Sequence, residues 1–197
     1  IGHGPFSHAL EHSIVENISH EAISLKFMEA LNIEFKGALD MAISMFKGDY
    51  SRQFFGQLIS GQLDIDRSDY LKRDSFYTGV SEGNINSDRL ISMMNVVDDE
   101  LVIEEKGIYS IEKFLTARRL MYWQVYLHKT SLVAEQMITR ILKRAKDLTH
   151  EGLNLEASSA LRFFLNSDTL NEKFDASTLN QFSLLDDYDI MSALKSW

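Results

Sequence analysis

The sequence predicts an all-α fold that carries one small β-hairpin, and three observations support this. Pro5 is the only proline in 197 residues, and an interior proline would break a helix because it removes a hydrogen bond and clashes with the preceding turn. Apolar residues recur at helical spacing along most of the chain. Residues 90–105 alternate instead between apolar and polar side chains around Asp98 and Asp99, which indicates a hairpin.

Capping residues place the main helices. Ser19 can cap a helix that has Glu21 in its first turn, and Ser110 can cap a long helix that runs to about Asp147. A helix is also expected from Ser7, after a glycine-rich turn. The remaining helices are expected at about residues 39–47, 51–59, 64–76, 155–166, 175–183 and 186–195.

Composition limits the class of protein. Hydrophobic residues make up 45% and charged residues 25% of the chain, which is typical of a soluble globular protein. No apolar run is long enough to span a bilayer, so a membrane partner is not expected. The absence of cysteine excludes disulfides and thiolate metal sites and favours a reducing compartment, the cytoplasm. A net charge of −9 argues against nucleic acid as the main partner, because phosphate neutralisation needs a basic face.

The first candidate cluster is His3, His8, His20 and Glu21. Four of the six histidines fall in the first twenty residues. Imidazole transfers protons and binds metals near neutral pH, and the glycines beside His3 would allow close approach to a phosphate. The alternative is a polar helix entry with solvated histidines.

Two further candidate sets lie at helical i, i+4, i+8 spacing. Asp66, Tyr70 and Asp74 share one helix face beside Arg67, which suits a hard cation, a sugar and a phosphate. The alternative is a solvated, charged helix. The second set consists of Arg118, Tyr122 and Tyr126. These side chains could line a nucleotide pocket. The alternative is that the tyrosines pack in the core.

These blocks resemble the HD-domain phosphohydrolases of the deoxynucleoside triphosphate triphosphohydrolase (dNTPase) type. Residues 1–8, Ile-Gly-His-Gly-Pro-Phe-Ser-His, resemble the stretch that follows the family's His-Asp pair. His20-Glu21 resembles the next His-Glu pair, residues 64–74 resemble the distal Asp motif, and the stretch from Arg118 to Lys129 resembles the family's long helix. The four blocks occur in family order and cover about residues 1–130.

The resemblance implies a role for each matching residue. His8 would transfer a proton near the α-phosphate, supported by His20 and Glu21, and Asp66 would be the last metal ligand. The metal would be divalent, one of Mg, Mn, Fe, Zn or Ni. The phosphates, the sugar and its pocket would be contacted by His3, Arg67, Tyr70, Asp74, Arg118, Tyr122 and Tyr126.

Two departures from the family pattern qualify these expectations. The upstream His and the His-Asp pair are missing from this sequence, so the fragment alone is expected to be inactive. Arg67 stands where a relative has Lys, and a planar guanidinium binds phosphate differently from an ammonium. We expect an N-terminally incomplete HD-type domain over residues 1–150 and a helical extension over residues 151–197.

The resemblance implies hydrolysis of a deoxynucleoside triphosphate (dNTP) to deoxynucleoside and triphosphate. Two alternatives remain. One is another HD-domain phosphohydrolase acting on a mono- or cyclic nucleotide, and the other is a nucleotide-binding regulatory protein without activity. The expected partners are the nucleotide substrate, a nucleotide activator and further copies of the chain, because His128-Lys129 resembles part of a nucleotide site between subunits.

Overall fold

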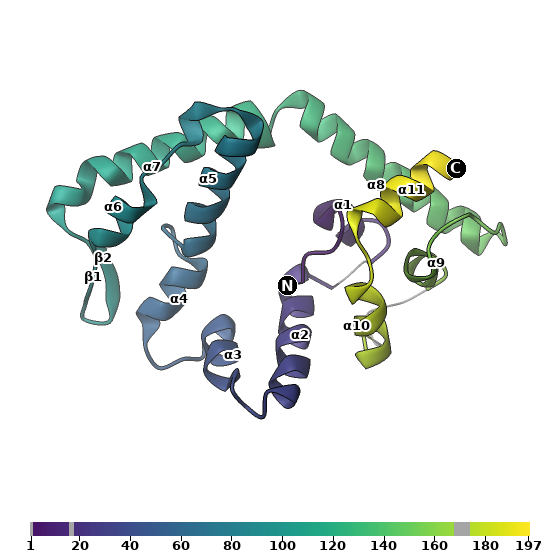
Figure 1. Cartoon of the computed structure of the whole chain (residues 1–197), viewed down its shortest axis with the longest axis horizontal. Coiled ribbons are helices and arrows are strands. Elements are labelled where there is room, and N and C mark those ends of the chain that lie inside the picture. The colour runs from purple at the N-terminus through teal and green to yellow at the C-terminus, as the bar shows by residue number, and fades with distance from the viewer. Residues whose placement is uncertain (1, 16–17, 168–173) are drawn as a thin grey trace. The chain divides into compact units, whose positions relative to one another are not determined.

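The protein is helical except for one two-stranded antiparallel hairpin, as predicted. This computed structural model describes residues 2–15, 18–167 and 174–197 (Figure 1). The chain forms two compact units, one built from residues 1–39 and 133–197 and the other from residues 40–132. No helix in these described ranges is long and apolar enough to cross a membrane. The expected boundary near residue 150, between an HD-type domain and a helical extension, stays a prediction.

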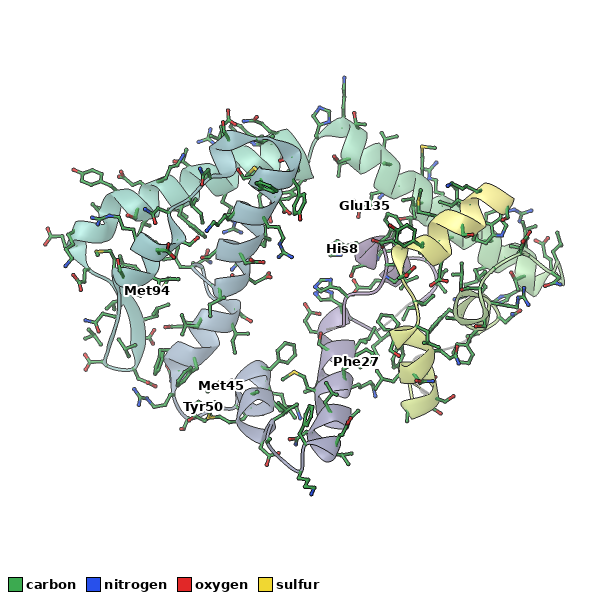
Figure 2. The ribbon with its side chains drawn as sticks, viewed as in Figure 1. His8, Phe27, Met45, Tyr50, Met94 and Glu135 are labelled. Carbon is green, nitrogen blue, oxygen red and sulfur yellow. The ribbon has the colours of Figure 1, made fainter. Side chains whose placement is uncertain are left out.

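The discontinuous unit packs its helices around one apolar core. Leu10, Ile23, Leu142, Phe164 and Ile190 are among its most buried side chains. Phe27, labelled in Figure 2, packs against this core and lies 6.2 Å from the ring of Phe182. The helices are α1 (Ser7–Glu11), α2 (His20–Glu34), α9 (Ser159–Leu165), α10 (Ala176–Ser183), α11 (Asp187–Ser196) and, from residue 133 onward, α8 (Lys129–His150).

The continuous unit, residues 40–132, has a separate core between α5 and α7. Leu71 of α5 is fully buried, as are Phe114, Ala117 and Met121 of α7. Its helices are α3 (Asp40–Lys47), α4 (Gln53–Ser60), α5 (Ile65–Thr78), α6 (Ser87–Ser92) and α7 (Ile108–Met121). The 3₁₀ turns are η1 (Ser81–Gly83) and η2 (Glu105–Gly107), and the strands are β1 (Met94–Val97) and β2 (Glu100–Ile103).

Two expectations about α7 and α8 were wrong. Ser110 does not cap a helix, because α7 begins at Ile108, directly after the η2 turn, which leads the backbone into the helix without a side-chain cap. The predicted single helix to about Asp147 is interrupted. A π-helical segment, Tyr122–Tyr126, follows α7, and α8 starts afresh at Lys129. The cap by Ser19 is confirmed, since its Oγ accepts from the Ala22 N–H.

The hairpin turn is held to the start of α4. Val97 pairs with Glu100, so Asp98 and Asp99 form a two-residue turn in which both have positive φ, 51° and 65°. Asp99 accepts hydrogen bonds from Arg52 Nε and from the Gln53 backbone N–H, both at 2.7 Å. These contacts, the Arg52 bond first, hold the pKa of Asp99 below its ordinary value.

We predict that Arg52→Ala raises the pKa of Asp99 toward its ordinary value. Because the folded pKa is lowered, the contact stabilises the fold above the unfolded pKa, and this stabilisation is lost as the pH falls through the folded pKa. NMR titration of the Asp99 carboxyl carbon measures the change. Arg73→Ala, which removes an exposed arginine paired with Asp69, is the control. An unchanged Asp99 pKa in Arg52→Ala would contradict the assignment.

Candidate functional site

The loop before α1 is pressed against the start of α2. The Gly2 N–H donates to Ser24 Oγ at 2.8 Å. A Cβ on Gly2 would lie 2.1 Å from the His20 carbonyl oxygen, so only glycine fits. This close approach stacks the His3 ring on that of His20, with 4.3 Å between ring centroids. Helix α1 brings the ring of His8 edge-on to His20 at 6.1 Å. The predicted group therefore gathers within one unit.

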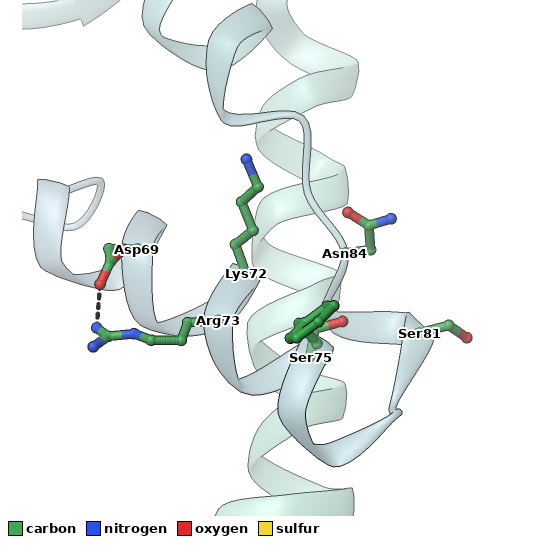
Figure 3. Close-up of a pocket in the computed structure, with 7 residues that line it drawn as sticks. Asp69, Lys72, Arg73, Ser75, Ser81 and Asn84 are labelled. Atoms are coloured by element: carbon green, nitrogen blue, oxygen red, sulfur yellow. Dashed lines mark hydrogen bonds and ion pairs between the residues drawn. The ribbon is translucent and has the colours of Figure 1, made fainter.

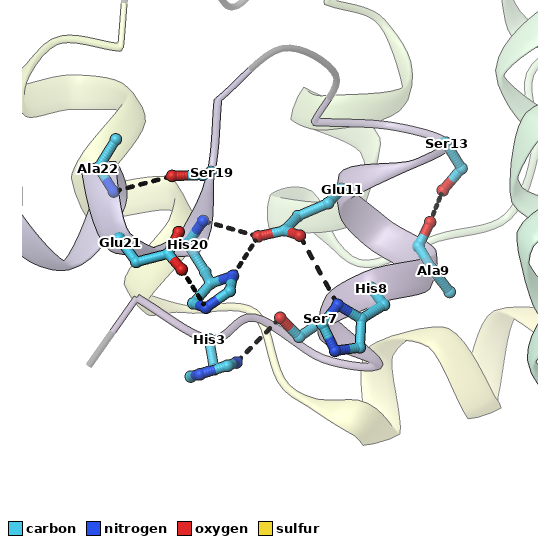
Figure 4. Close-up of polar contacts among 10 residues, drawn as sticks. All are labelled: His3, Ser7, His8, Ala9, Glu11, Ser13, Ser19, His20, Glu21 and Ala22. Carbon is cyan, nitrogen blue, oxygen red and sulfur yellow. Dashed lines mark hydrogen bonds and ion pairs between the residues drawn. The ribbon is translucent and has the colours of Figure 1, made fainter. Parts of the chain in front are cut away.

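His20 is held between two carboxylates (Figure 4). Its Nδ1 lies 2.8 Å from Glu11 Oε1, and its Nε2 lies 3.1 Å from Glu21 Oε1. The His20 backbone N–H also donates to Glu11 Oε1, at 2.6 Å. Each ring nitrogen of His20 thus lies beside a carboxylate oxygen that can accept a hydrogen bond. The Ser19 hydroxyl, through a hydrogen bond, is the largest influence that lowers the pKa of Glu21, and the charge of His20 adds to it.

Glu11 is the member of this group that the sequence analysis missed. Its second oxygen, Oε2, lies 3.8 Å from His8 Nδ1, so one partly buried carboxylate faces two imidazoles. Its side chain is 18% exposed, whereas that of His8 is 65% exposed and accessible to a ligand. The i, i+3 spacing from His8 to Glu11 was a usable signal. The contact with His20 crosses a turn and could not be read from spacing. We call His3, His8, Glu11, His20 and Glu21 the histidine cluster.

His3 differs from the other members of the histidine cluster in its hydrogen-bond partner, which is a hydroxyl. Its Nδ1 shares a hydrogen bond of 3.0 Å with Ser7 Oγ. Partial burial lowers the pKa of His3, and the adjacent His20 lowers it further. The neutral form of His3 is therefore favoured, in which one ring nitrogen donates a hydrogen bond and the other accepts one. A phosphate contact by His3 stays a prediction.

The second group lies in the continuous unit, where α5 meets α7 and the π-helical segment. The Tyr126 hydroxyl donates to Asp74 Oδ2 at 2.7 Å. The Tyr126 ring contacts those of Tyr70 and Tyr122 edge-on, with centroids 5.9 Å and 5.2 Å away. The Arg118 guanidinium carbon lies 5.7 Å from the Tyr122 ring centroid. We call these five residues the tyrosine cluster, and the structure brings all five together.

Two phenols of the tyrosine cluster have a raised pKa, and its arginine is available to a ligand. Burial raises the pKa of Tyr126, and the hydrogen bond and charge of Asp74 raise it further. Burial also raises the pKa of Tyr70. Within the part of the chain that the structure describes, Arg118 has no ion-pair partner. The cluster therefore combines neutral hydroxyls, one carboxylate and an unpaired cation, which suits a sugar that carries phosphate.

Arg67 is tied into the backbone that leads to α5. Its guanidinium Nη1 donates both to the Gly61 carbonyl oxygen and to Asp64 Oδ2. Asp64 is itself buried, and its Oδ1 caps α5 by accepting from the Arg67 backbone N–H at 2.7 Å. A lysine has a single nitrogen, whereas Arg67 can hold this loop and leave Nε and Nη2 for a ligand. Its predicted contact with phosphate stays a prediction.

Asp66 is an exposed carboxylate near the start of α5. In residues 2–15, 18–167 and 174–197, no three His, Asp or Glu side chains gather as a metal-binding group. One carboxylate does not hold a divalent cation tightly, because such ions take several oxygen or nitrogen ligands. The described residues therefore do not form a metal site by themselves. The predicted convergence of both clusters and Asp66 on one cleft also stays a prediction.

Comparisons with known proteins agree with a phosphohydrolase origin. Residues 85–160 match the family described as HD associated region. The crystal structure of a phosphohydrolase from Bacteroides thetaiotaomicron matches the whole of this chain with a TM-score of 0.95 and 59% sequence identity. That match covers 49% of the Bacteroides chain.

Two curated relatives are more distant. The uncharacterized protein YwfO of Bacillus subtilis is 37% identical over 77% of this chain and 36% of its own length. A deoxynucleoside triphosphate triphosphohydrolase SAMHD1 homolog of Dictyostelium discoideum is 29% identical over 90% of this chain and 37% of its own length. The chain thus spans between about a third and a half of the proteins that it resembles.

The contact between Tyr126 and Asp74 can be tested by titration. We predict that Asp74→Asn lowers the pKa of Tyr126, because the mutation removes a negative charge from beside the phenol. The pKa should stay above the ordinary value, since burial is the larger cause. Site-specific NMR titration of Tyr126 measures it. Asp69→Asn, on another face of α5, should leave it unchanged, and an unaltered Tyr126 in Asp74→Asn would refute the contact.

Proposed function

This chain is a relative of the HD-domain phosphohydrolases, and we propose that the protein hydrolyses a dNTP to deoxynucleoside and triphosphate. The observation that carries the choice of substrate is the tyrosine cluster. Its hydrogen-bonded Tyr126–Asp74 pair can hold a sugar hydroxyl, and Tyr70 packs edge-on beside it. The printed name of the Dictyostelium relative supports the same substrate class.

Tyr70 and Asp74 would distinguish deoxyribose from ribose. Asp74 accepts from Tyr126 through one oxygen, Oδ2, and its remaining lone pairs can accept from a sugar 3′-hydroxyl. Tyr70 would occupy the space that a 2′-hydroxyl needs. Its hydroxyl is neutral at ordinary pH because burial raises its pKa. Discrimination against ribonucleotides would thus come from exclusion, and recognition of the deoxysugar from a hydrogen bond.

The phosphates would be neutralised by two arginines of the continuous unit. Arg118 has no ion-pair partner in the described ranges, and Arg67 retains two unused guanidinium nitrogens. A guanidinium binds phosphate oxygens through paired N–H donors. His3, kept neutral by its lowered pKa, would add one further donor.

The histidine cluster would move the proton. Attack by water at the α-phosphorus forms a phosphorus–oxygen bond and breaks the bond to the 5′-oxygen. The attacking water gives up a proton to solvent, and the 5′-oxygen, which leaves on the deoxynucleoside, takes up a proton. The exposed His8 would deliver that proton. Glu11 would position His8 and His20 together, because its two oxygens face both rings. His20, held also by Glu21, would stabilise negative charge at the phosphate.

HD-domain phosphohydrolases as a class use divalent metals. Asp66 would supply one ligand, and the other ligands would have to come from residues outside this sequence. The identity of the ion is open among Mg, Mn, Fe, Zn and Ni. Assembly with further copies of the chain, a nucleotide activator and a cytoplasmic location are further parts of the proposal.

The product identifies the reaction. We predict that the longest natural protein containing this sequence, given each dNTP with Mg²⁺ or Mn²⁺, releases inorganic triphosphate, detected by phosphorus NMR. Glu11→Gln should lower kcat roughly 10- to 100-fold with a small change in KM, as expected for a positioning residue. Glu34→Gln, at the far end of α2, is the control. Release of phosphate or diphosphate instead of triphosphate would overturn the proposal in favour of another nucleotide phosphohydrolase, and nucleotide binding without turnover would favour a regulatory protein.

Tyr70 can be tested by sugar selectivity. We predict that Tyr70→Ala in the same protein lowers the ratio of kcat/KM for dGTP over GTP by roughly 10- to 200-fold, because a steric exclusion of this kind is worth about 1–3 kcal/mol. Asp66→Ala should abolish turnover of both nucleotides. Tyr77→Ala, an exposed tyrosine of the same helix, is the matched control. An unchanged ratio in Tyr70→Ala would make Tyr70 a structural residue only.

A further inference from the structure

A pocket lies on α5, and none of its lining residues belongs to the tyrosine cluster (Figure 3). Its volume is about 550 Å³, within the usual range for small-molecule sites. Helix α5 supplies Asp69, Lys72, Arg73 and Phe76, and the η1 turn and the residues after it supply Ser81 and Asn84. The whole pocket belongs to the unit of residues 40–132. Nothing in the proposed reaction uses it.

The pocket and the tyrosine cluster lie on different faces of one helix. Each residue of an α-helix turns by about 100°. Asp69, Lys72, Arg73 and Phe76 follow i, i+3, i+4 and i+7 spacing and share a face. Asp74 is turned toward Tyr126, to which it is hydrogen bonded. A ligand in the pocket would therefore meet neither Tyr126 nor the Asp74 carboxylate.

The charge of the pocket favours an anion. Its lining carries two cations, Lys72 and Arg73, and one carboxylate, Asp69, hence a net +1 within a chain of net charge −9. Lys72 has no ion-pair partner in the described part of the chain. Arg73 pairs with Asp69, but both side chains are more than half exposed, and such pairs are weak. The Arg73 guanidinium therefore keeps donors for a ligand.

The uncharged lining suits a planar ring with polar edges. Phe76 exposes 80% of its surface, which is unusual for a phenylalanine, and the Tyr77 ring meets it edge-on with 5.2 Å between ring centroids. In Figure 3 the Asp69–Arg73 pair lies on one side of the pocket, Ser81 and Asn84 lie on the other, and Ser75 lies between them. Ser75 donates its hydroxyl hydrogen to the Val80 carbonyl at 2.8 Å, which ties the helix to the η1 turn. The exposed Ser81 hydroxyl and Asn84 amide can form hydrogen bonds to polar atoms at the edge of a ring.

We propose that this pocket binds a small phosphorylated ligand with a planar ring, of the nucleoside monophosphate class. Lys72 and Arg73 hold the phosphate, Phe76 stacks on the ring, and Ser81 and Asn84 hydrogen bond to its edge. The pocket is separate from the substrate site, so this inference does not rest on the proposed hydrolysis.

AMP is the probe, with adenosine and inorganic phosphate as separate arms. Equilibrium dialysis of radiolabelled AMP against the longest natural protein containing this sequence gives the affinity, and photoreactive azido-AMP followed by peptide mapping gives the place. We expect saturable AMP binding, labelling within residues 69–84, and weaker binding of adenosine and of phosphate alone. Lys72→Ala and Phe76→Ala should each weaken AMP binding roughly tenfold.

Lys143→Ala, an exposed lysine of α8, is the matched control and should bind AMP as the unmodified protein does. Labelling confined to peptides with Tyr122 and Tyr126 would overturn the proposal, because AMP would then occupy the tyrosine cluster. Phosphate that binds as tightly as AMP would overturn the role of the ring. An unchanged affinity in both pocket variants, or no saturable binding at all, would overturn the site. If the protein does not hydrolyse dNTPs, the expected binding of AMP to this pocket is unchanged, because the two sites are separate.

Discussion

The packing of α5 on α7 sets the chemistry of the continuous unit. Leu71 is fully buried against Phe114, Ala117 and Met121, and burial of one leucine side chain contributes about 1.5–3 kcal/mol. An exposed ion pair such as Asp69–Arg73 contributes about 0–1 kcal/mol. This apolar contact between α5 and α7, which we call the apolar seam, therefore decides how α5 is rotated about its own axis. Once Leu71 faces inward, Tyr70 and Asp74 fall on one side of it, and Lys72, Arg73 and Phe76 fall on another. Gly83 allows the same seam to close, because a Cβ there would lie 2.6 Å from the Met121 sulfur.

In the discontinuous unit, the histidine cluster holds ionisable side chains in fixed positions near the surface. His20 meets a carboxylate at each ring nitrogen, and Glu11 meets an imidazole at each oxygen. Every polar atom at the centre of this arrangement has a partner of opposite character, so no member bears the full cost of burial alone. The exposed ring of His8 is joined to the network at 3.8 Å, the distance from its Nδ1 to Glu11 Oε2. The network can therefore orient His8 without preventing contact between His8 and a ligand.

Local signals in the sequence predicted most of the helices, because caps and periodicity act over a few residues. Ser19 caps α2 as expected, and the hairpin forms around Asp98 and Asp99. The sequence could not predict the start of α7 at Ile108, because η2 leads into that helix and does so through backbone geometry. The candidate residues form one cluster in each unit, whereas their predicted convergence on a single cleft stays a prediction. Glu11 was missed because its partner His20 lies nine residues away across a turn, and Arg67 was assigned to phosphate alone because its bond to the Gly61 carbonyl depends on how the preceding loop folds.

The π-helical segment Tyr122–Tyr126 has a consequence for how this part of the protein can change. A π turn holds one residue more than the α turn it replaces, so it behaves as a tolerated single-residue insertion. Loss of one residue there would restore an ordinary α-helix at little cost to the backbone. It would also rotate Tyr126 by about 100° relative to Arg118 and carry its hydroxyl away from Asp74. Small changes of length in this segment are thus a route by which related proteins could alter their ligand while they keep the same core.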